Sequence, residues 1–515
     1  MAKAVLPRGS LFAPSSPLHS EWGKLAALLV WCFLLRAPTF LRSVIDGDES
    51  LYVLVADRWG HGCLPYIAVW DHKPPGVYVL FLMAFGALGH SLIAIRILAS
   101  AFVFGAAVLI YGIGYVATGE RPVALVAAAA YPAFSILWRG TAANVEHFFI
   151  VFDLAAALVL TVIHVRRPTG AQRWWRVLAA GLCFGLALQL KYIAIFEIAF
   201  FFVLYAFREW QILPAASRGR LLGELAAMIA MAIVPTAAAA AYFLAFGQLG
   251  EFVDANFFAN VRHAAPHRSM ETVISGVLSL GRWLAESGPL WVAPVFLFLR
   301  RPTVPGCSPI GSRRVALVLA AWVLVGLVEA ASTSRFYAHY FLVTLPPLCL
   351  LAGEAWRWGG SIRRSLGHPV VWAMVLCAFP VTFISILDYR EWIAERLSGM
   401  ADEPARVASY IRPRLRPGES IYVVDSEPII YFLADAQLPT RYAFPPFLMD
   451  EHFSAVARVD YKREFESILR QEPRCIVLQN PGRPRARELR AMLGSEYGQN
   501  RAFDTIDVIC RDRSG

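Results

Sequence analysis

Long apolar stretches recur along this chain between residues 25 and 386, and they limit what it can fold into. A helix needs roughly 20 apolar residues to cross about 30 Å of hydrocarbon, and most of these stretches approach that length. Hydrophobic residues make up 57% of the 515 residues and charged residues only 17%, which is too little polar surface for a soluble globule of this size. The sequence therefore predicts a polytopic helical membrane protein.

The net charge of +10 does not indicate nucleic-acid binding, because Lys and Arg concentrate in short connections between apolar stretches. Basic connections of this kind mark the cytoplasmic side of a membrane protein. They occur at 119–121, 164–176, 208–220, 300–314 and 357–364. If all five face the cytoplasm, the remaining connections between apolar stretches face the external side.

This rule predicts about eleven membrane spans that follow a cytoplasmic leader over 1–24 and end on the external side. We expect the spans over about 25–42, 92–117, 122–138, 146–164, 176–190, 192–207, 221–246, 277–299, 315–331, 338–355 and 369–387. The apolar run 75–90 is too short to be one of them, because its sixteen residues make a helix of only about 24 Å. We expect it to be interfacial or re-entrant. One kinked helix over 176–207 is the alternative to two spans joined at Lys191.

The chain divides into a transmembrane domain over 25–390 and a tail over 391–515. The first external loop, 43–91, carries interfacial helices in this interpretation. In the tail, short apolar runs at 421–425, 475–478 and 506–509 alternate with helical patterns, which predicts a small external α/β domain. The eight cysteines have no CxxC or zinc spacing, although Cys475 and Cys510 of the tail could pair.

Ionisable residues beside spans are costly unless they have partners or work to do, so their distribution is informative. On this topology they gather on the external side, where the loops collect Asp46, Asp48, Glu49, Asp71, His72, Lys73, Arg139, Asn144, Glu146, His147, Lys191, Arg335, Tyr337 and His339. Each has a simpler explanation: the first three carboxylates could cap a helix over 49–59, Lys73 could anchor a helix opened by proline, and the others could belong to an interfacial belt. Their shared side favours a functional site.

A carboxylate among several cations suits transfer of a group from a lipid phosphate. The carboxylate takes a proton from an acceptor hydroxyl, and the cations stabilise the departing phosphate. Phosphate is a good leaving group and needs no second acid, whereas glycosidases pair two carboxylates.

Five short motifs in this order resemble those of the GT-C superfamily of membrane glycosyltransferases, in the branch of protein O-mannosyltransferases and lipid A aminoarabinose and galacturonic acid transferases. They are Asp48-Glu-Ser-Leu-Tyr52, Asp71-His-Lys-Pro-Pro75, Asn144-Val-Glu146, Leu190-Lys191, and Arg335-Phe-Tyr-Ala-His339 with Leu345-Pro-Pro-Leu348. The resemblance covers about residues 25–355. Ser50 and Gln189 depart from the usual pattern, which blurs the subfamily more than the reaction.

The resemblance implies that Asp48 is the catalytic base, that Glu146 is a second carboxylate, and that Glu49 belongs to the same catalytic group. It implies donor-phosphate contacts from Lys73, Lys191, Arg335 and His339, and supporting roles for Asp46, Tyr52, Asp71, His72, Asn144 and Tyr337. The donor would be a polyprenyl-phosphate sugar and the acceptor an external hydroxyl of a lipid, glycan or protein, with inversion at the anomeric carbon. The enzyme would be integral to the cell (inner) membrane, with its site and tail on the periplasmic side.

No cofactor is expected. The acidic cluster could hold a divalent cation, since hard cations take carboxylates, but the lysines and Arg335 could neutralise the phosphate without one, and metal independence is favoured.

Two other functions fit the same composition. A flippase for lipid-linked sugars would carry inverted repeats and midplane polar groups, which the sequence does not show. A ligase or polymerase using a lipid diphosphate donor would also gather cations at the external face.

Overall fold

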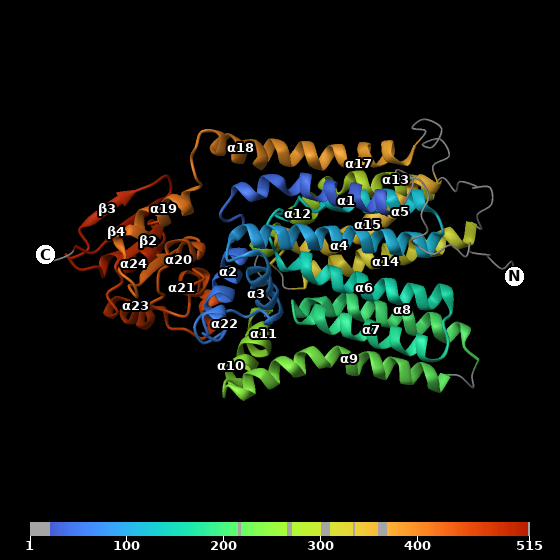
Figure 1. Ribbon diagram of the computed structural model, residues 1–515, viewed down its shortest axis with the longest axis horizontal. Coiled ribbons are helices and arrows are strands. Elements are labelled where there is room, and N and C mark those ends of the chain that lie inside the picture. The colour runs from blue at the N-terminus through green and yellow to red at the C-terminus, as the bar shows by residue number, and fades with distance from the viewer. Residues whose placement is uncertain are drawn as a thin grey trace.

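The computed structural model describes residues 21–214, 218–264, 270–299, 309–332, 335–358 and 368–512. Figure 1 shows an elongated helical bundle followed by a small domain of strands and short helices at its C-terminal end. Residues 1–20 of the leader expected over 1–24 lie outside the described residues. The first helix begins at Glu21, inside that expected leader.

The helices of the bundle follow the predicted apolar stretches, except that the span predicted over 277–299 is divided between two of them at Ser287. They are α1 (Glu21–Arg36), α4 (Leu92–Thr118), α5 (Arg121–Phe134), α6 (Val145–Arg166), α7 (Gly170–Leu188), α8 (Ile195–Ile212), α9 (Arg218–Ala245), α12 (Met270–Glu286), α13 (Gly288–Leu299), α14 (Pro309–Ala331), α15 (Leu345–Trp358) and α17 (Pro369–Ile384). Within the described ranges, seven helical segments are long and apolar enough to cross a membrane. The count of eleven spans stays a prediction, because several of the helices are shorter than a full crossing.

Helices α7 and α8 form an antiparallel pair. Arg173, near the start of α7, forms an ion pair of 2.7 Å with Glu209, near the end of α8. Arg167, just after α6, also pairs with Glu209 at 2.6 Å. The basic connections at 164–176 and 208–220 therefore lie at one end of the bundle, and Lys191 lies in the turn at the other. The alternative of one kinked helix over 176–207 is excluded.

Two short helices, α2 (Gly47–Gly60) and α3 (Gly76–Leu88), lie at the end of the bundle that faces the C-terminal domain (Figure 1). Asp46 caps α2 by accepting a hydrogen bond of 3.1 Å from the Asp48 amide, so the expected capping role is real for this residue. Helix α3 contains 13 residues, about 20 Å of helix, which is too short to cross the hydrocarbon.

The same end of the bundle carries several shorter elements. These are the 3-10 helices η1 (Ala37–Leu41), η2 (Tyr192–Ala194) and η5 (Ala338–Thr344), helices α10 (Leu249–Val253) and α11 (Ala259–His263) with the π-helical turn η4 (Asp254–Phe258) between them, and η6 (Ser385–Tyr389) with α18 (Arg390–Leu397).

The C-terminal domain has a four-stranded sheet in the order β1-β2-β4-β3, from β1 (Ile421–Val424), β2 (Cys475–Gln479), β3 (Gln499–Ala502) and β4 (Ile506–Cys510). Strand β1 is parallel to β2, and the other pairs are antiparallel. Its helices are α19 (Glu403–Ile411), η7 (Arg412–Arg414), α20 (Ile429–Ala434), α21 (Pro446–Met449), α22 (Glu451–Ala457), α23 (Tyr461–Arg470) and α24 (Pro484–Ala491). The three strands expected from the sequence are present, and β3 is additional.

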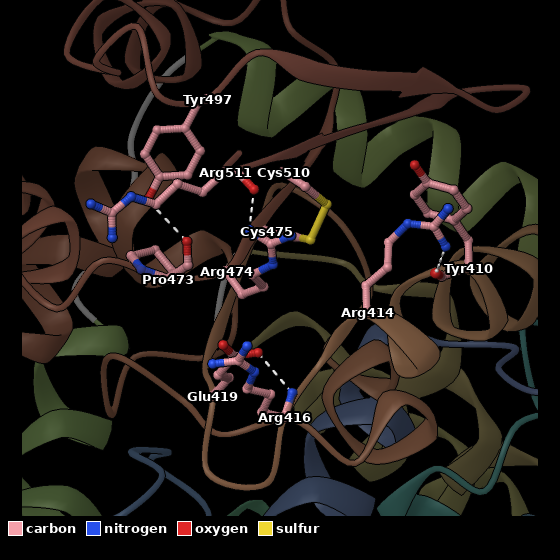
Figure 2. Close-up of a disulfide and its surroundings, with 10 residues drawn as sticks. All are labelled: Tyr410, Arg414, Arg416, Glu419, Pro473, Arg474, Cys475, Tyr497, Cys510 and Arg511. Atoms are coloured by element: carbon pink, nitrogen blue, oxygen red, sulfur yellow. Dashed lines mark hydrogen bonds between the residues drawn. A yellow bond between two sulfur atoms is a disulfide. The ribbon is translucent and has the colours of Figure 1, made fainter. Parts of the chain in front are cut away.

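Cys475 and Cys510 face each other in the antiparallel register of β2 and β4 and form a disulfide, as Figure 2 shows. The pairing that the sequence left open is therefore present in the structure.

The C-terminal domain packs directly on the end of the bundle that carries α2. The Ile429 amide donates a hydrogen bond of 2.6 Å to the Ser50 hydroxyl, and the Trp70 amide donates one of 2.7 Å to the Arg441 carbonyl. The Trp70 ring meets Phe447 edge to face at 4.7 Å. The domain therefore covers part of this end of the bundle.

Candidate active site

Asp48 projects from the first turn of α2, where free amide groups and the helix dipole favour a negative charge. Its carboxylate accepts a hydrogen bond of 3.2 Å from the Tyr52 hydroxyl one turn later. The Lys73 ammonium lies 3.8 Å from the same carboxylate oxygen. The Asp48 side chain is 24% exposed, so an incoming group can reach it.

Lys73 is held by a tight contact between its loop and the turn after α7. The Tyr66 hydroxyl donates to the Lys73 carbonyl at 2.9 Å, and the Gly76 amide donates to the Gln189 carbonyl at 2.9 Å. A Cβ on Gly76 would lie 2.3 Å from that carbonyl oxygen, so only glycine permits the approach. The contact brings the loop of Lys73 beside the turn that carries Lys191.

Glu146 and Lys191 form a second, more buried carboxylate–lysine pair. Glu146 lies in the first turn of α6 and is 1% exposed. Its Oε1 contacts the Lys191 ammonium directly, while its Oε2 has no hydrogen-bond partner in the described structure. The ammonium also lies 3.8 Å from the centre of the Tyr340 ring in η5.

The charges around α2 set the ionisation of the first pair. Burial alone would raise the pKa of the Asp48 carboxyl, but Lys73, His339 and Lys191 together lower it below its ordinary value. Burial and the Asp48 charge raise the pKa of the neighbouring Asp46. Burial opposes the charge on Lys73, yet Asp48 and Asp71 raise the pKa of its ammonium. At neutral pH the site therefore holds an ionised Asp48 beside a charged lysine.

Asp71 and His72 support the loop of Lys73 rather than face Asp48. Asp71 accepts a hydrogen bond of 2.7 Å from the Tyr78 hydroxyl, and burial raises the pKa of its carboxyl. The His72 ring packs against His263 of α11 at 4.9 Å. Burial and the nearby Lys73 lower the pKa of His72 well below its ordinary value, so the imidazole is neutral.

The residues before α15 divide between two neighbours. His339 is buried and close enough to Asp48, Asp46 and Glu146 to act on all three electrostatically. The Tyr337 ring stacks on it at 5.8 Å. Arg335 instead lies 5.8 Å from the Phe453 ring of the C-terminal domain, and its Nη2 is buried without a hydrogen-bond partner in the described structure.

Comparisons with known proteins show what the sequence and the fold resemble. Residues 49–247 match the family model of dolichyl-phosphate-mannose-protein mannosyltransferase. The fold is similar to that of ArnT from Cupriavidus metallidurans bound to undecaprenyl phosphate, with a TM-score of 0.64 and 17% identity over 95% of this chain and 98% of that one. The matched sequence and the shared fold are those of membrane glycosyltransferases of the GT-C type.

A second solved structure is less similar to this chain. The Archaeoglobus fulgidus oligosaccharyltransferase in the apo form aligns with a TM-score of 0.49 and 12% identity over 89% of this chain and 69% of that one, which is too low to support an argument. No curated protein matches the sequence significantly.

Two further predicted site residues, Glu49 and Asn144, make structural contacts. Glu49 is turned away from Asp48, because neighbouring helix positions point about 100° apart. Its carboxylate pairs with the buried Arg96 of α4 and accepts a hydrogen bond of 2.6 Å from the Ala143 amide. Asn144 precedes α6 and donates to the Arg139 carbonyl at 3.2 Å. These contacts favour a positioning role for Glu49 rather than the catalytic role that we predicted.

Sequence reasoning missed Glu427, which the C-terminal domain brings to the start of α2. A Cβ added to Gly47 would lie 3.5 Å from its Oε2, which is buried without a hydrogen-bond partner in the described structure. Burial, with Asp46 and Glu49 adding to it, raises the pKa of Glu427 to about 7. The available signal was its position just beyond β1, at the carboxyl end of a parallel strand, where functional groups of α/β sheets collect.

The side chains of the site bear on whether it can hold a metal ion. Across the part of the chain that the structure describes, no three or more His, Cys, Asp or Glu side chains are placed to hold a metal ion. The charges around Asp48 are balanced by lysines and His339.

Proposed function

We propose that this enzyme transfers a single sugar from a polyprenyl-phosphate donor to a hydroxyl group of an external lipid, glycan or protein, with inversion at the anomeric carbon. The observation that carries the proposal is the ionised, partly exposed Asp48 carboxylate 3.8 Å from the Lys73 ammonium. One group can accept a proton there, and the other can hold a phosphate.

In the proposed reaction, the oxygen of the acceptor hydroxyl attacks the anomeric carbon while Asp48 takes the proton of that hydroxyl. The bond between that carbon and the phosphate oxygen breaks on the opposite face, and its electron pair leaves with the phosphate. Lys73, Lys191 and His339 stabilise the charge that develops on this leaving group. The products are the glycosylated acceptor and the polyprenyl phosphate, and Asp48 then releases its proton to water.

Glu146 has a different proposed role. Its contact with Lys191 fixes the ammonium, while its unpartnered Oε2 can accept a hydrogen bond from a sugar or acceptor hydroxyl. We assign Arg335 to the donor phosphate as well. Its guanidinium lies over the Phe453 ring of the C-terminal domain, and its unpartnered Nη2 can donate a hydrogen bond to an anion.

The donor class is supported by the relatives. The matching family model is described as using dolichyl-phosphate-mannose, and the similar ArnT structure holds undecaprenyl phosphate. Both are polyprenyl phosphates with a single phosphate group. We propose that no divalent cation is needed, because the lysines, His339 and Arg335 supply positive charge around the leaving phosphate.

We propose that the site and C-terminal domain face the periplasmic side of the inner membrane. Disulfides persist in oxidising compartments, and Cys475–Cys510 lies in this domain. The basic connections after α6 and α8 lie at the opposite end of the bundle, as the cytoplasmic side requires.

The test is mass spectrometry of envelope glycolipids, glycans and glycoproteins from cells that lack the protein, complemented with wild type, Asp48→Asn or Asp57→Asn. Asp57 is the matched control, because it lies on α2 about 13 Å further along the helix and pairs with Arg58 and His90 instead. We expect one sugar to be lost from a defined acceptor and to return with wild type and Asp57→Asn only. Full restoration by Asp48→Asn at equal protein level would remove Asp48 from its proposed role, and accumulation of a lipid diphosphate donor would favour a ligase.

A further inference from the structure

A short helical segment lies between the loop of Lys73 and the C-terminal domain. This bridging segment spans residues 249–263 and comprises α10, the π-helical turn η4 and α11. Figure 1 shows α11 beside α22 of the C-terminal domain. Several of its side chains are fully covered, namely Phe252, Ala255, Asn256 and Ala259. The bridging segment is therefore packed into the protein rather than laid loosely on its surface.

Asn260 of α11 holds the main chain directly before Lys73. Its Nδ2 donates hydrogen bonds to the His72 carbonyl at 2.7 Å and to the Asn256 carbonyl at 2.8 Å. An amide nitrogen carries two hydrogens, so both of its donors are used. One bond fixes the side chain to the bridging segment itself, and the other fixes the loop of Lys73.

Tyr66 holds the main chain on the other side of Lys73. Its hydroxyl donates to the Lys73 carbonyl at 2.9 Å. The carbonyl groups before and after the Lys73 Cα are thus both held. Lys73 is buried, and a close-packed environment leaves its side chain little room to compensate for a displaced backbone. The distance of 3.8 Å between its ammonium and Asp48 therefore depends on the position of the loop.

The bridging segment is tied to the C-terminal domain two residues after Asn260. The Arg262 Nε donates to the Val456 carbonyl of α22 at 2.8 Å. The other two nitrogens of this guanidinium contact both carboxylate oxygens of Asp254, at 3.0 and 2.9 Å. A bidentate contact of this kind fixes the plane of the guanidinium, so Arg262 is held in the orientation that its bond to α22 requires.

We infer that Asn260 is a positioning residue for Lys73, and that Arg262 links that position to the docking of the C-terminal domain. Asn260 acts through the His72 carbonyl and contacts neither the Lys73 ammonium nor Asp48 in the structure. The domain that covers part of the site thereby also determines where the lysine of the donor phosphate lies. This role goes beyond the proposed transfer reaction and rests on the proposed binding of the donor phosphate by Lys73.

The experiment measures the binding of undecaprenyl phosphate to the purified full-length protein in detergent, by native mass spectrometry. The test variant is Asn260→Ala, which removes both donors. Val261→Ala is the matched control, because it shortens the neighbouring side chain of α11, which is 71% exposed. Both variants are also made in the Lys73→Met background. An effect that passes through Lys73 disappears there, whereas a general loosening of the fold weakens binding in both backgrounds.

We expect Lys73→Met to weaken the binding of undecaprenyl phosphate by roughly tenfold or more, because a hydrogen bond between charged groups is lost. Asn260→Ala should weaken it by about three- to tenfold when Lys73 is present, and by nothing further in Lys73→Met. Val261→Ala should bind like its parent in both backgrounds. Arg262→Gln should reproduce the effect of Asn260→Ala, and it replaces that variant if Asn260→Ala does not fold.

Two results would overturn the inference alone. One is binding as tight as that of wild type in Asn260→Ala. The other is an equal loss in the two backgrounds, because Asn260 would then support the fold and not Lys73. Unchanged binding in Lys73→Met would instead remove the proposed donor role of Lys73, and the positioning role of Asn260 with it.

Discussion

Replacing Lys73 with methionine removes the cation nearest to the proposed base and should move the pH dependence of transfer. Two unit charges 3.8 Å apart interact by about 4 kcal/mol at an effective dielectric constant near 20, equivalent to about three pKa units. Water reaches the partly exposed Asp48, and His339 and Lys191 remain, so we expect the pKa of its carboxyl to rise by about one to three units.

A base works only when deprotonated, so a higher pKa moves the acid limb of activity to higher pH. The measurement is kcat/KM against pH in proteoliposomes, because this parameter reports the free enzyme. Weaker donor binding would lower kcat/KM at every pH without moving the acid limb. The measurement therefore separates the role of Lys73 in donor binding from its effect on the pKa of Asp48. Lys73→Arg should keep the wild-type limb, and Lys462→Met on α23 serves as the surface control. An acid limb that stays in place in Lys73→Met would refute the electrostatic argument.

Three further predictions concern stability, each measured by thermal unfolding or by the yield of monodisperse full-length protein in detergent. Glu427 keeps its proton in the folded protein up to about pH 7, so the folded protein loses stability as the pH rises from about 4.5 to 7. The Glu427→Gln variant should therefore be more stable than wild type by up to about 3 kcal/mol at pH 8 and equally stable near pH 4. The exposed Glu466→Gln should show no such difference, and equal gains for Glu427→Gln at both pH values would contradict the prediction. Serine at both Cys475 and Cys510 should cost about 3–4 kcal/mol, given a sequence separation of 35 residues, and reductant should lower the unfolding temperature of wild type alone. Glu49→Gln leaves the Arg96 charge buried and unpaired, which costs about 3–5 kcal/mol, and Arg96→Gln in the same chain should recover part of the yield.

The sequence predicted the helices and the convergence of charges because both follow from simple constraints. The length of each apolar stretch predicts a helix. Successive connections lie on alternate sides of a membrane, which predicts the end of the bundle to which each connection belongs. That reasoning was enough to bring Asp48, Lys73, Glu146, Lys191 and His339 to one site. It could not give the pairing within the site, which depends on the close approach of Gly76 to the Gln189 carbonyl.

Contacts with the C-terminal domain were beyond sequence reasoning for a physical reason. Glu427 lies beside Gly47 of α2, and Phe453 lies beside Arg335, although more than a hundred residues of chain separate each pair. Periodicity reports which face of an element is buried, and it does not report against which partner. Glu49 shows the same limit, because a carboxylate beside the base in sequence turns to Arg96 in the folded chain.

The two carboxylate–lysine pairs differ in a way that supports the roles proposed for them. Glu146 contacts Lys191 directly, and its side chain is 2% exposed, so moving a proton onto it would leave a buried lysine charge without its partner. Asp48 is separated from Lys73 by 3.8 Å, outside hydrogen-bond distance, and its side chain is 24% exposed. A phosphate that attracts Lys73 would further weaken the hold on Asp48 and raise the basicity of its carboxylate. Donor binding would therefore prepare the base, which explains why the more loosely paired carboxylate is the one suited to deprotonate the acceptor.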